Sequence, residues 1–461
     1  MTAGHLLHPS ILREYDIRGI VGETLSVDDA LAIGCAFATM VAEDRGPTPE
    51  ICLGVDGRLT SPALEAALAE GMVSAGASVL RVGRGPTPML YFGVHYLQAD
   101  AGVMVTGSHN PPEHNGFKFM LGSGSFYGNR LKRLGDLAAE GVPAADGGQV
   151  EDVDVFDAYV EALAAAYRGR GRLKVVWDPG NGASGDVVQA LGRRLPGRHD
   201  VINGDIDGTF PSHHPDPTVA ANLVQLQRHI GEGSHDIGIA LDGDGDRIGV
   251  VDDRGRIIWA DLLMALLARD VLSARPGATV IADVKSSQAL FDEVASLGGN
   301  PVMWRTGHSL IKAKMVEANA PLAGEMSGHL FFADEYYGFD DAAYAAVRLL
   351  NVIEGSGESL SALRDRLPTL ANTPEIRFDC PDEEKFGVVA ELRDRLVSEG
   401  RQVDDIDGVR VNSEDGWWLL RASNTQAVLV ARCEARDQAA LSRVKSALEA
   451  ELARSGIRLP G

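Results

Sequence analysis

The feature that most constrains this chain is a repeated alternation of short apolar runs with helical patterns. A helical pattern over residues 63–75, opened by Ser61-Pro62, separates two apolar runs, and a third follows them; the runs cover residues 51–55, 78–82 and 101–106. Serine favours the N-cap and proline the first helical position, so the helix start has a physical basis. The β-α-β alternation predicts a mostly parallel sheet with helices on both faces.

The alternation restarts twice before a different pattern begins near residues 372–374. In the second and third rounds we expect strands at 173–177, 237–241, 248–251 and 279–283, and helices at 185–195 and 261–272. Beyond the break we expect a charged helix at 382–399 and strands at 375–379, 409–412, 417–421 and 427–432. Segment 140–152 has the composition of a linker.

We therefore predict the α/β class: three similar mixed-sheet α/β domains and a smaller α+β C-terminal domain around a central cleft. The expected domain limits are 1–151, 152–256, 257–370 and 371–461. A length of 461 residues agrees with this number of domains.

Charge restricts the classes of partner. Asp and Glu number 65 against 43 Lys and Arg, a formal net charge of −22. Such a surface repels nucleic acid and anionic membranes, so we expect neither as a partner. An anionic substrate would need a local basic pocket.

Other sequence features bear on the compartment. No apolar run approaches the roughly 18 residues of a membrane span, and the first residues lack the pattern of a signal peptide. Four scattered cysteines without CxxC spacing predict core residues rather than a disulfide framework or a zinc site. We expect a cytoplasmic protein.

A serine-containing turn follows the run at 101–106. Residues 106–112 read Thr-Gly-Ser-His-Asn-Pro-Pro. A serine held outward by glycine and proline suits a nucleophile or a phosphate carrier. An ordinary Ser-Asn-Pro turn has the same letters, and this loop taken alone favours the ordinary turn, because such turns are common.

Three aspartates alternate with glycines between two expected strands. Asp242, Asp244 and Asp246 would repel one another in a tight turn unless a cation lay between them. An EF-hand is the nearest alternative, but its sixth position needs glycine and here holds Arg247. Three protein oxygens leave coordination positions open, one of which a phosphate oxygen could fill, as in Mg²⁺ sites.

Two further loops carry polar side chains that suit a sugar phosphate. Residues 324–329 (Gly-Glu-Met-Ser-Gly-His) set a carboxylate, a hydroxyl and an imidazole between glycines, and residues 421–425 (Arg-Ala-Ser-Asn-Thr) offer donors for a phosphate. Either loop alone is also compatible with an ordinary turn. Weaker signals are Lys118, Lys285 and the short polar loop 306–309.

Together and in this order, the four loops resemble the α-D-phosphohexomutases, and most closely the bacterial bifunctional phosphomannomutase/phosphoglucomutase family. The resemblance spans about residues 13 to 432. Two positions depart from the family pattern: Gln426-Ala427 stands where relatives commonly have Thr/Glu-Pro, and Val55 precedes Asp56-Gly57-Arg58 where relatives often have a basic residue.

The resemblance implies roles for individual residues. Ser108 would carry the phosphoryl group and, with Asp242, Asp244 and Asp246, bind one Mg²⁺ per chain. Catalytic groups beside Ser108 would be Arg18, Arg247, Lys118 and His329, the last two as candidates for proton transfer. Substrate-binding residues would be Tyr15, Lys285, Thr306, Gly307, His308, Glu325, Ser327, Arg421, Ser423, Asn424 and Thr425.

The implied reaction interconverts hexose 1-phosphates and hexose 6-phosphates through a phosphoserine enzyme. Glucose 1,6-bisphosphate would be activator and intermediate, small sugar phosphates the partners, and a monomer the expected state. Reading the 3- and 4-hydroxyls through Glu325 and Ser327 would accept both glucose and mannose, which differ at C2. Alternatives are a phosphoglucosamine mutase, although those relatives usually carry glutamine at the position of Met326, a metal-dependent phosphatase, and a non-catalytic sugar-phosphate or Ca²⁺-binding protein.

Overall fold

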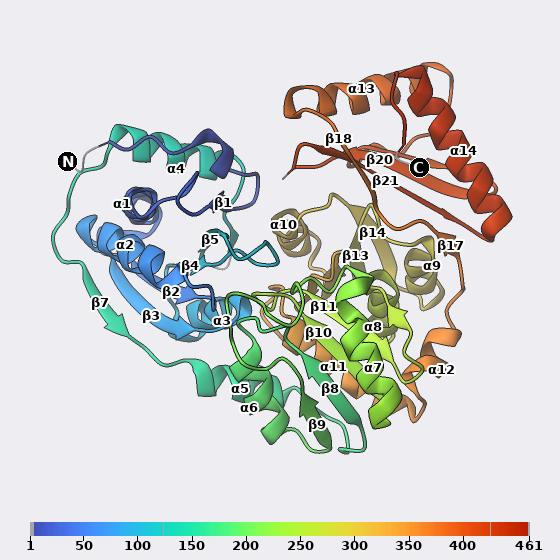
Figure 1. The fold of residues 1–461 in the computed structure, drawn as a ribbon, viewed down its shortest axis with the longest axis horizontal. Helices are drawn as coiled ribbons and strands as arrows, with labels where there is room; N and C mark the ends of the chain where they lie inside the picture. Colours follow the sequence, from blue (N-terminus) through green and yellow to red (C-terminus); the bar gives the residue numbers. More distant parts are fainter. Residues whose placement is uncertain (1–3, 123, 425, 460–461) are drawn as a thin grey trace.

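The computed structural model describes residues 4–122, 124–424 and 426–459. They form four sheets with helices packed on them, three units in an arc and a fourth that stands beside the arc's end (Figure 1). Three similar mixed-sheet α/β units and a smaller α+β unit around a cleft are the architecture predicted from the sequence, and that prediction is confirmed. Among the residues just given, no helix has the length and apolar character needed to cross a membrane.

The first sheet has the strand order β1-β5-β4-β2-β3-β7, with β6 paired to β5. Strands β4, β2, β3 and β7 are parallel; next to β4 lies β5, which is antiparallel to it, and beyond β5 lies β1, which is antiparallel to β5. The strands are β1 (Ile17–Ile20), β2 (Glu50–Val55), β3 (Ser78–Arg84), β4 (Ala101–Val105), β5 (His114–Leu121), β6 (Gly124–Ser125) and β7 (Gln149–Asp152), and the helices are α1 (Val27–Arg45), α2 (Ser61–Ser74), α3 (Thr87–Leu97) and α4 (Asn129–Glu140), after the short turn η1 (Pro9–Ile11).

Two glycines allow α1 and α2 to pack backbone against backbone. A Cβ atom at Gly34 would lie 2.2 Å from the backbone oxygen of Leu68, and one at Gly71 would lie 2.1 Å from that of Leu31. Any larger residue at either position would force the two helices apart, so part of the chain's glycine content serves this contact.

Two sequence expectations in this unit need correction. Segment 140–152 is not only a linker, because its last residues form β7, which extends the sheet beside β3. Ser61 is the first residue of α2 rather than its N-cap; Thr60 holds that position. The Ser61 hydroxyl donates a hydrogen bond to Asp56 and therefore does not cap the helix, although serine is common at the N-cap position.

The second and third sheets share one large hydrophobic core, in which Trp177 and Leu263 are both buried. The second has the order β12-β11-β10-β8-β9 and the third β14-β13-β15-β16. In the second unit the elements are α5 (Phe156–Ala165), β8 (Lys174–Asp178), α6 (Gly185–Arg194), β9 (Arg198–Val201), η2 (Ala220–Leu223), α7 (Val224–Gly233), β10 (Ile237–Leu241), β11 (Ile248–Asp252) and β12 (Ile257–Ile258). In the third they are α8 (Ala260–Ala274), β13 (Thr279–Asp283), α9 (Gln288–Ser296), β14 (Asn300–Trp304), α10 (His308–Ala318), β15 (Leu322–Gly324), β16 (Leu330–Phe332), α11 (Ala342–Ser356) and α12 (Leu360–Asp365). Because β12 pairs with β11, the second sheet runs past the domain limit expected at residue 256; the four domain limits stay predictions.

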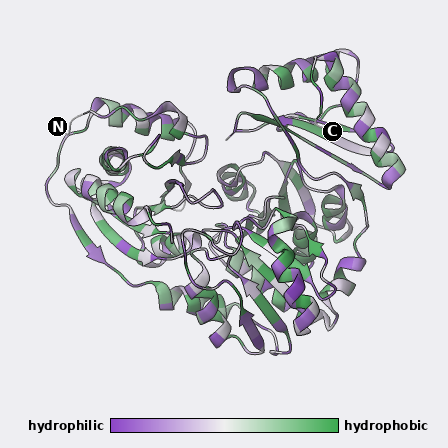
Figure 2. Cartoon of the chain, in the orientation of Figure 1, coloured by the Kyte–Doolittle hydropathy of each residue, from purple (hydrophilic) through white to green (hydrophobic). Residues whose placement is uncertain are grey.

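The fourth sheet has a hydrophobic core of its own and packs its two long helices on one face (Figure 1). Its order is β17-β21-β20-β19, with β18 also paired to β21, and all its pairings are antiparallel. The elements are β17 (Ala371–Asn372), β18 (Ile376–Asp379), α13 (Asp382–Ser398), β19 (Val409–Asn412), β20 (Gly416–Ala422), β21 (Val428–Ala435) and α14 (Gln438–Arg454). Hydropathic colouring shows apolar residues on most central strands and alternating polar and apolar residues along the helices (Figure 2), as expected where helices cover sheets.

Candidate active site

The serine loop, residues 106–114, connects the ends of β4 and β5. Ser108 has a φ of +50°, a left-handed conformation that non-glycine residues rarely adopt. Its amide donates to the Thr106 hydroxyl at 2.8 Å, and its own hydroxyl donates to Asp242 Oδ2 at 3.0 Å. A strained serine, 1 % exposed and pointed at a carboxylate of another unit, is a common feature of functional sites.

The metal loop, residues 242–247, turns tightly between β10 and β11. The side chains of Asp242, Asp244 and Asp246 are fully buried, and one carboxylate oxygen from each lies within 4.8 Å of the others. Among the described residues, Asp244 Oδ1 and Asp246 Oδ1 have no hydrogen-bond partner. Burial and the two neighbouring carboxylates raise the pKa of Asp242. A hard divalent cation would relieve this repulsion, so the donor set fits Mg²⁺.

Lys118 lies on β5 and faces the metal loop. Its Nζ donates to Asp244 Oδ2 at 2.7 Å and also to Asp246. Burial alone would lower the pKa of Lys118, but the carboxylates of Asp244 and Asp246 raise it above its ordinary value. Lys118 is therefore a protonated, positively charged group at neutral pH.

His329 is held at both ring nitrogens. Nε2 lies 2.9 Å from Arg247 Nε, which can only donate, so Nε2 is the acceptor. Nδ1 then carries the proton and donates to Asp340 Oδ2 at 2.9 Å. The two partners fix one tautomer of a neutral imidazole whose only lone pair faces Arg247.

The sugar loop, residues 324–329, connects β15 to β16. Glu325 Oε1 accepts the backbone N–H of Gly307 at 2.6 Å, and burial raises the pKa of Glu325. His308 begins α10 and stacks on the ring of His329 at 5.5 Å between centroids. Burial and the nearby Lys312 hold the pKa of His308 well below its usual value, so it is neutral.

The phosphate loop, of which residues 421–424 and 426 are described, begins with the last two residues of β20 in the fourth unit and precedes β21. Asp407 Oδ2 accepts from Nε and Nη2 of Arg421, each at 3.0 Å, and from the backbone N–H of Thr306 at 3.0 Å. Burial alone would lower the pKa of Arg421, but Asp407 raises it. Asn424 donates to the Tyr15 hydroxyl at 2.7 Å, which donates to the Thr306 carbonyl at 2.9 Å. Three units thus meet at this loop.

One cleft of about 390 Å³ gathers most of the predicted residues. Its walls include Tyr15, Arg18, Arg247, Lys285, Thr306, Gly307, His308, Glu325, Ser327, His329, Arg421, Ser423 and Asn424. Ser108, Lys118 and the three aspartates are buried and do not line the cleft, although Ser108 directly precedes the lining residues His109 and Asn110. Thr425 lies outside the described residues.

Several residues of the site carry no sequence signal that our interpretation used. Asp340, Asp407 and Glu375 are the carboxylate partners of His329, Arg421 and Lys285, the last at 2.7 Å. Each lies far along the chain from its partner or outside the four loops. Arg377 also lines the cleft. Only the fold of the chain places these carboxylates beside their cations, so the sequence alone does not predict them.

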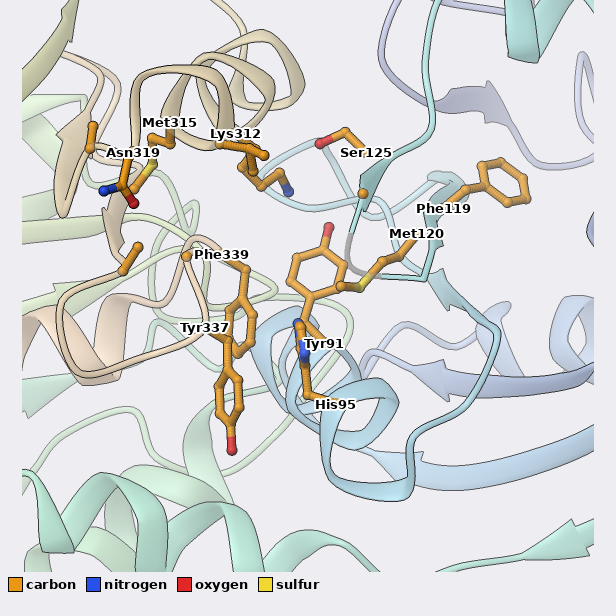
Figure 3. A pocket seen from close by; sticks show the side chains of 15 residues that line it. Tyr91, His95, Phe119, Met120, Ser125, Lys312, Met315, Asn319, Tyr337 and Phe339 are labelled. Atoms are coloured by element: carbon orange, nitrogen blue, oxygen red, sulfur yellow. The ribbon is translucent and has the colours of Figure 1, made fainter. Parts of the chain in front are cut away.

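A second cavity of about 270 Å³ lies between α3, β5, α10 and the loop before α11 (Figure 3). Aromatic side chains and Lys312 line it, and none of the predicted site residues that the structure describes does. The Nζ atom of Lys312 lies 4.7 Å from the centre of the Tyr91 ring. The cavity is thus separate from the cleft, but Lys312 reaches Asp340 Oδ1 at 3.0 Å and so touches the His329 network.

Comparison with known proteins gives four family matches along the chain. They are the phosphoglucomutase/phosphomannomutase alpha/beta/alpha domains I (residues 9–134), II (157–255) and III (259–370), and the C-terminal domain of the same family (375–451).

Whole-length relatives agree with the domain matches. A phosphomannomutase/phosphoglucomutase of Pseudomonas putida is 42 % identical over 97 % of this chain and 96 % of its own length. A phosphoglucomutase of Neisseria gonorrhoeae is 42 % identical over 95 % and 96 %. A crystal structure of a phosphoglucomutase/phosphomannomutase family protein from Burkholderia thailandensis superposes with a TM-score of 0.93 at 41 % identity, covering 99 % of this chain and all of the other. These matches confirm the resemblance that the four loops indicate: the chain belongs to the phosphoglucomutase/phosphomannomutase family of enzymes.

Proposed function

We propose that the protein interconverts the 1- and 6-phosphates of glucose and mannose through a phosphoserine at Ser108 and a hexose 1,6-bisphosphate intermediate, with Mg²⁺. The observation that carries this proposal is the 3.0 Å contact between Ser108 Oγ and Asp242, next in sequence to His109 and Asn110, which line the same cleft as Arg421. A phosphoryl carrier at one end and a phosphate-binding group at the other suit a substrate with phosphates on either side of a sugar ring.

Asp242, Asp244 and Asp246, with an oxygen of the phosphorylated Ser108, would hold the Mg²⁺ ion. When bound, the ion supplies positive charge to the phosphoryl oxygens. Phosphoryl transfer passes through a loose transition state whose catalysis is mostly positioning and electrostatics. Arg18, at the cleft wall, and the protonated Lys118 add positive charge from the protein.

The sugar hydroxyl that receives the phosphoryl group needs a base, and the geometry favours His329 over Lys118. Lys118 is ion-paired with Asp244 and Asp246, whereas His329 is held in the tautomer inferred above. Its lone pair at Nε2 faces Arg247 at 2.9 Å. A phosphate entering the cleft would attract Arg247 and leave that lone pair to the hydroxyl.

Substrate orientation rests on Glu325 and Ser327, with the non-reacting phosphate at Arg421, Ser423, Asn424, Thr425 and Lys285. The 3- and 4-hydroxyls roughly exchange places when the bisphosphate turns over, so one loop can serve both orientations. Neither hydroxyl distinguishes glucose from mannose, which supports activity on both.

The fourth unit, residues 371–461, would act as a lid that excludes water, because water competes with the sugar hydroxyl for the phosphoryl group. Its separate core and the Asn424–Tyr15 contact across the cleft support this role. The other proposed domains are 1–151, 152–256 and 257–370. A monomer would be sufficient, since the cleft contains groups from all four units, and the cytoplasm suits the proposed metabolic substrates.

The test is isomerisation of glucose 1-phosphate and mannose 1-phosphate, side by side, with Mg²⁺ and a trace of glucose 1,6-bisphosphate. Conversion of both to the 6-phosphates at comparable kcat/KM is the expected result. Free phosphate without isomer would reveal a phosphatase, and conversion of glucosamine phosphate alone would reveal the other mutase. Activity towards none of them would contradict the proposal.

A further inference from the structure

Arg58 lies beneath the serine loop and donates to four of its backbone carbonyls. Its Nη1 donates to the carbonyls of Pro111 at 2.6 Å and His114 at 2.9 Å, and its Nη2 to those of Ser108 at 2.7 Å and Asn110 at 2.6 Å. The side chain is completely buried. Burial of a charged guanidinium is unfavourable unless nearly every donor is satisfied, and here the loop itself satisfies them.

Asp56 fixes the orientation of this guanidinium. Its Oδ2 accepts from Arg58 Nε and from the Gly107 amide, both at 3.2 Å, and its Oδ1 accepts from the Ser61 hydroxyl at 2.6 Å. A Cβ atom at Gly107 would lie 2.5 Å from Arg58 Cζ. The serine loop and the arginine are therefore fitted to one another at van der Waals distance.

The second unit covers the other side of Arg58. The ring of Phe210 lies 5.1 Å from Arg58 Cζ, and a Cβ atom at Gly208 would lie 2.5 Å from Arg58 Cα. The same segment continues to Pro215, whose carbonyl accepts the amide of Gly243 in the metal loop at 3.2 Å. Arg58 thus contacts both the serine loop and the segment that supports the metal loop.

We propose that Arg58 is a positioning residue, which holds the serine loop in the conformation that sets the Ser108 hydroxyl against Asp242. This inference rests on the proposed function of Ser108. The loop has no regular secondary structure and contains a strained residue, so an external partner must fix it. Arginine alone offers five donors in one rigid plane; lysine has three donors on one nitrogen and cannot reach four carbonyls together.

The experiment compares Arg58→Lys and Arg58→Gln with the wild type and with a matched control, Arg348→Lys. Arg348 is also a buried arginine, paired with Asp270 at 2.7 Å and Asp334 at 2.8 Å, and these partners lie outside the serine and metal loops. Three quantities are measured: phosphorylation of Ser108 by glucose 1,6-bisphosphate in a single turnover, hydrogen exchange of peptides that cover residues 106–121, and the Kd of glucose 1-phosphate.

We expect both Arg58 variants to slow Ser108 phosphorylation about 100-fold, the effect of misplacing a reacting group by roughly 1 Å. Exchange in 106–121 should rise, while the Kd for glucose 1-phosphate changes less than about threefold because Glu325 and Arg421 are untouched. Arg348→Lys should lower thermal stability without changing either the phosphorylation rate or exchange in this loop.

Wild-type phosphorylation and exchange in Arg58→Lys would overturn the inference, as would an equal loss in Arg348→Lys. If the Arg58 variants fail to fold, Asp56→Asn takes their place, because it removes the charged partner of Arg58 Nε. It should change Ser108 phosphorylation and hydrogen exchange of residues 106–121 in the same direction but by less. No change in either measurement would again overturn the inference. A wild type that never phosphorylates Ser108 would instead refute the proposed function.

Discussion

The buried carboxylate of Asp340 accepts hydrogen bonds from two side chains, those of His329 and Lys312. Its Oδ2 accepts from His329 Nδ1 at 2.9 Å and its Oδ1 accepts from Lys312 Nζ at 3.0 Å. Burial alone would raise the pKa of Asp340, but Lys312 and the His329 hydrogen bond hold it well below its usual value. The carboxylate therefore accepts on both sides at every pH near neutrality.

The substitution Asp340→Asn should leave two hydrogen-bond donors facing each other. The amide has one oxygen and one NH₂ group, so either Lys312 or His329 must face the NH₂. Lys312 is charged and selects the oxygen, which leaves His329 Nδ1 to accept and forces its proton to Nε2, opposite Arg247 Nε. Loss of one charge-assisted hydrogen bond of about 1.5–3 kcal/mol predicts a fall in kcat of about 10- to 150-fold.

Adding Lys312→Met to the Asp340→Asn variant should restore part of the activity that Asp340→Asn loses. Lys312 lines the second cavity beside Met315 and Tyr91 (Figure 3), so a methionine has apolar neighbours there. Without the ammonium, the amide introduced by Asp340→Asn can turn its oxygen to His329 and recover the original tautomer. The double variant should therefore regain at least about tenfold in kcat over Asp340→Asn, an increment of about 1.4 kcal/mol.

The assay measures kcat, the Kd of glucose 1-phosphate and thermal unfolding for the wild type, both single variants and the double variant. A merely structural role for Asp340 predicts that the double variant is no more active than the single one, since it has lost two native side chains. That result, or a kcat for Asp340→Asn within about threefold of the wild type, would refute the tautomer argument.

Three further predictions follow from the same site and its surroundings. Ser108→Ala should abolish phosphoenzyme in an intact-mass measurement and lower kcat by more than about 10³-fold, with the Kd of glucose 1-phosphate retained; isomerisation by this variant at the wild-type rate would contradict the phosphoserine. Tyr15→Phe removes the hydroxyl that joins Asn424 to Thr306, so KM for glucose 1-phosphate should rise several-fold, and an unchanged KM would contradict its role in closure. Burial raises the pKa of Asp341 from 3.8 to about 6, so the folded state favours the neutral acid and the free energy of unfolding falls as pH rises from about 4 to 6. In denaturant unfolding, Asp341→Asn should therefore raise the free energy of unfolding by up to about 3 kcal/mol at pH 8 and by little at pH 4. An increase independent of pH would contradict this assignment.

The four loops could be found from the sequence because each is local. Glycine, proline and polar side chains at fixed spacings define a turn and its chemistry within about seven residues, and apolar runs on either side place that turn at a strand end. The strand at 149–152 was missed for the opposite reason. Its burial is low and its composition polar, so nothing local marks it; pairing with β3 at the sheet edge forms it.

The carboxylates that pair with the cations of the site were missed for the same reason, because no local sequence pattern marks them. The negative chain led us to expect a local basic pocket for an anionic substrate, yet the cleft's cations are paired: Arg421 with Asp407, Lys285 with Glu375 and Arg18 with Asp16, at 2.7 to 3.0 Å. A motif contains groups that would touch substrate, whereas a counter-charge needs only to be close in space and can come from any element. Because these carboxylates already pair with the cations, a sugar phosphate must share or displace them, which reduces its net binding energy relative to bare cations. In the proposed mechanism the bisphosphate would have to leave its first orientation before it reacts again, and unpaired arginines and lysines would hold it more tightly and slow that step.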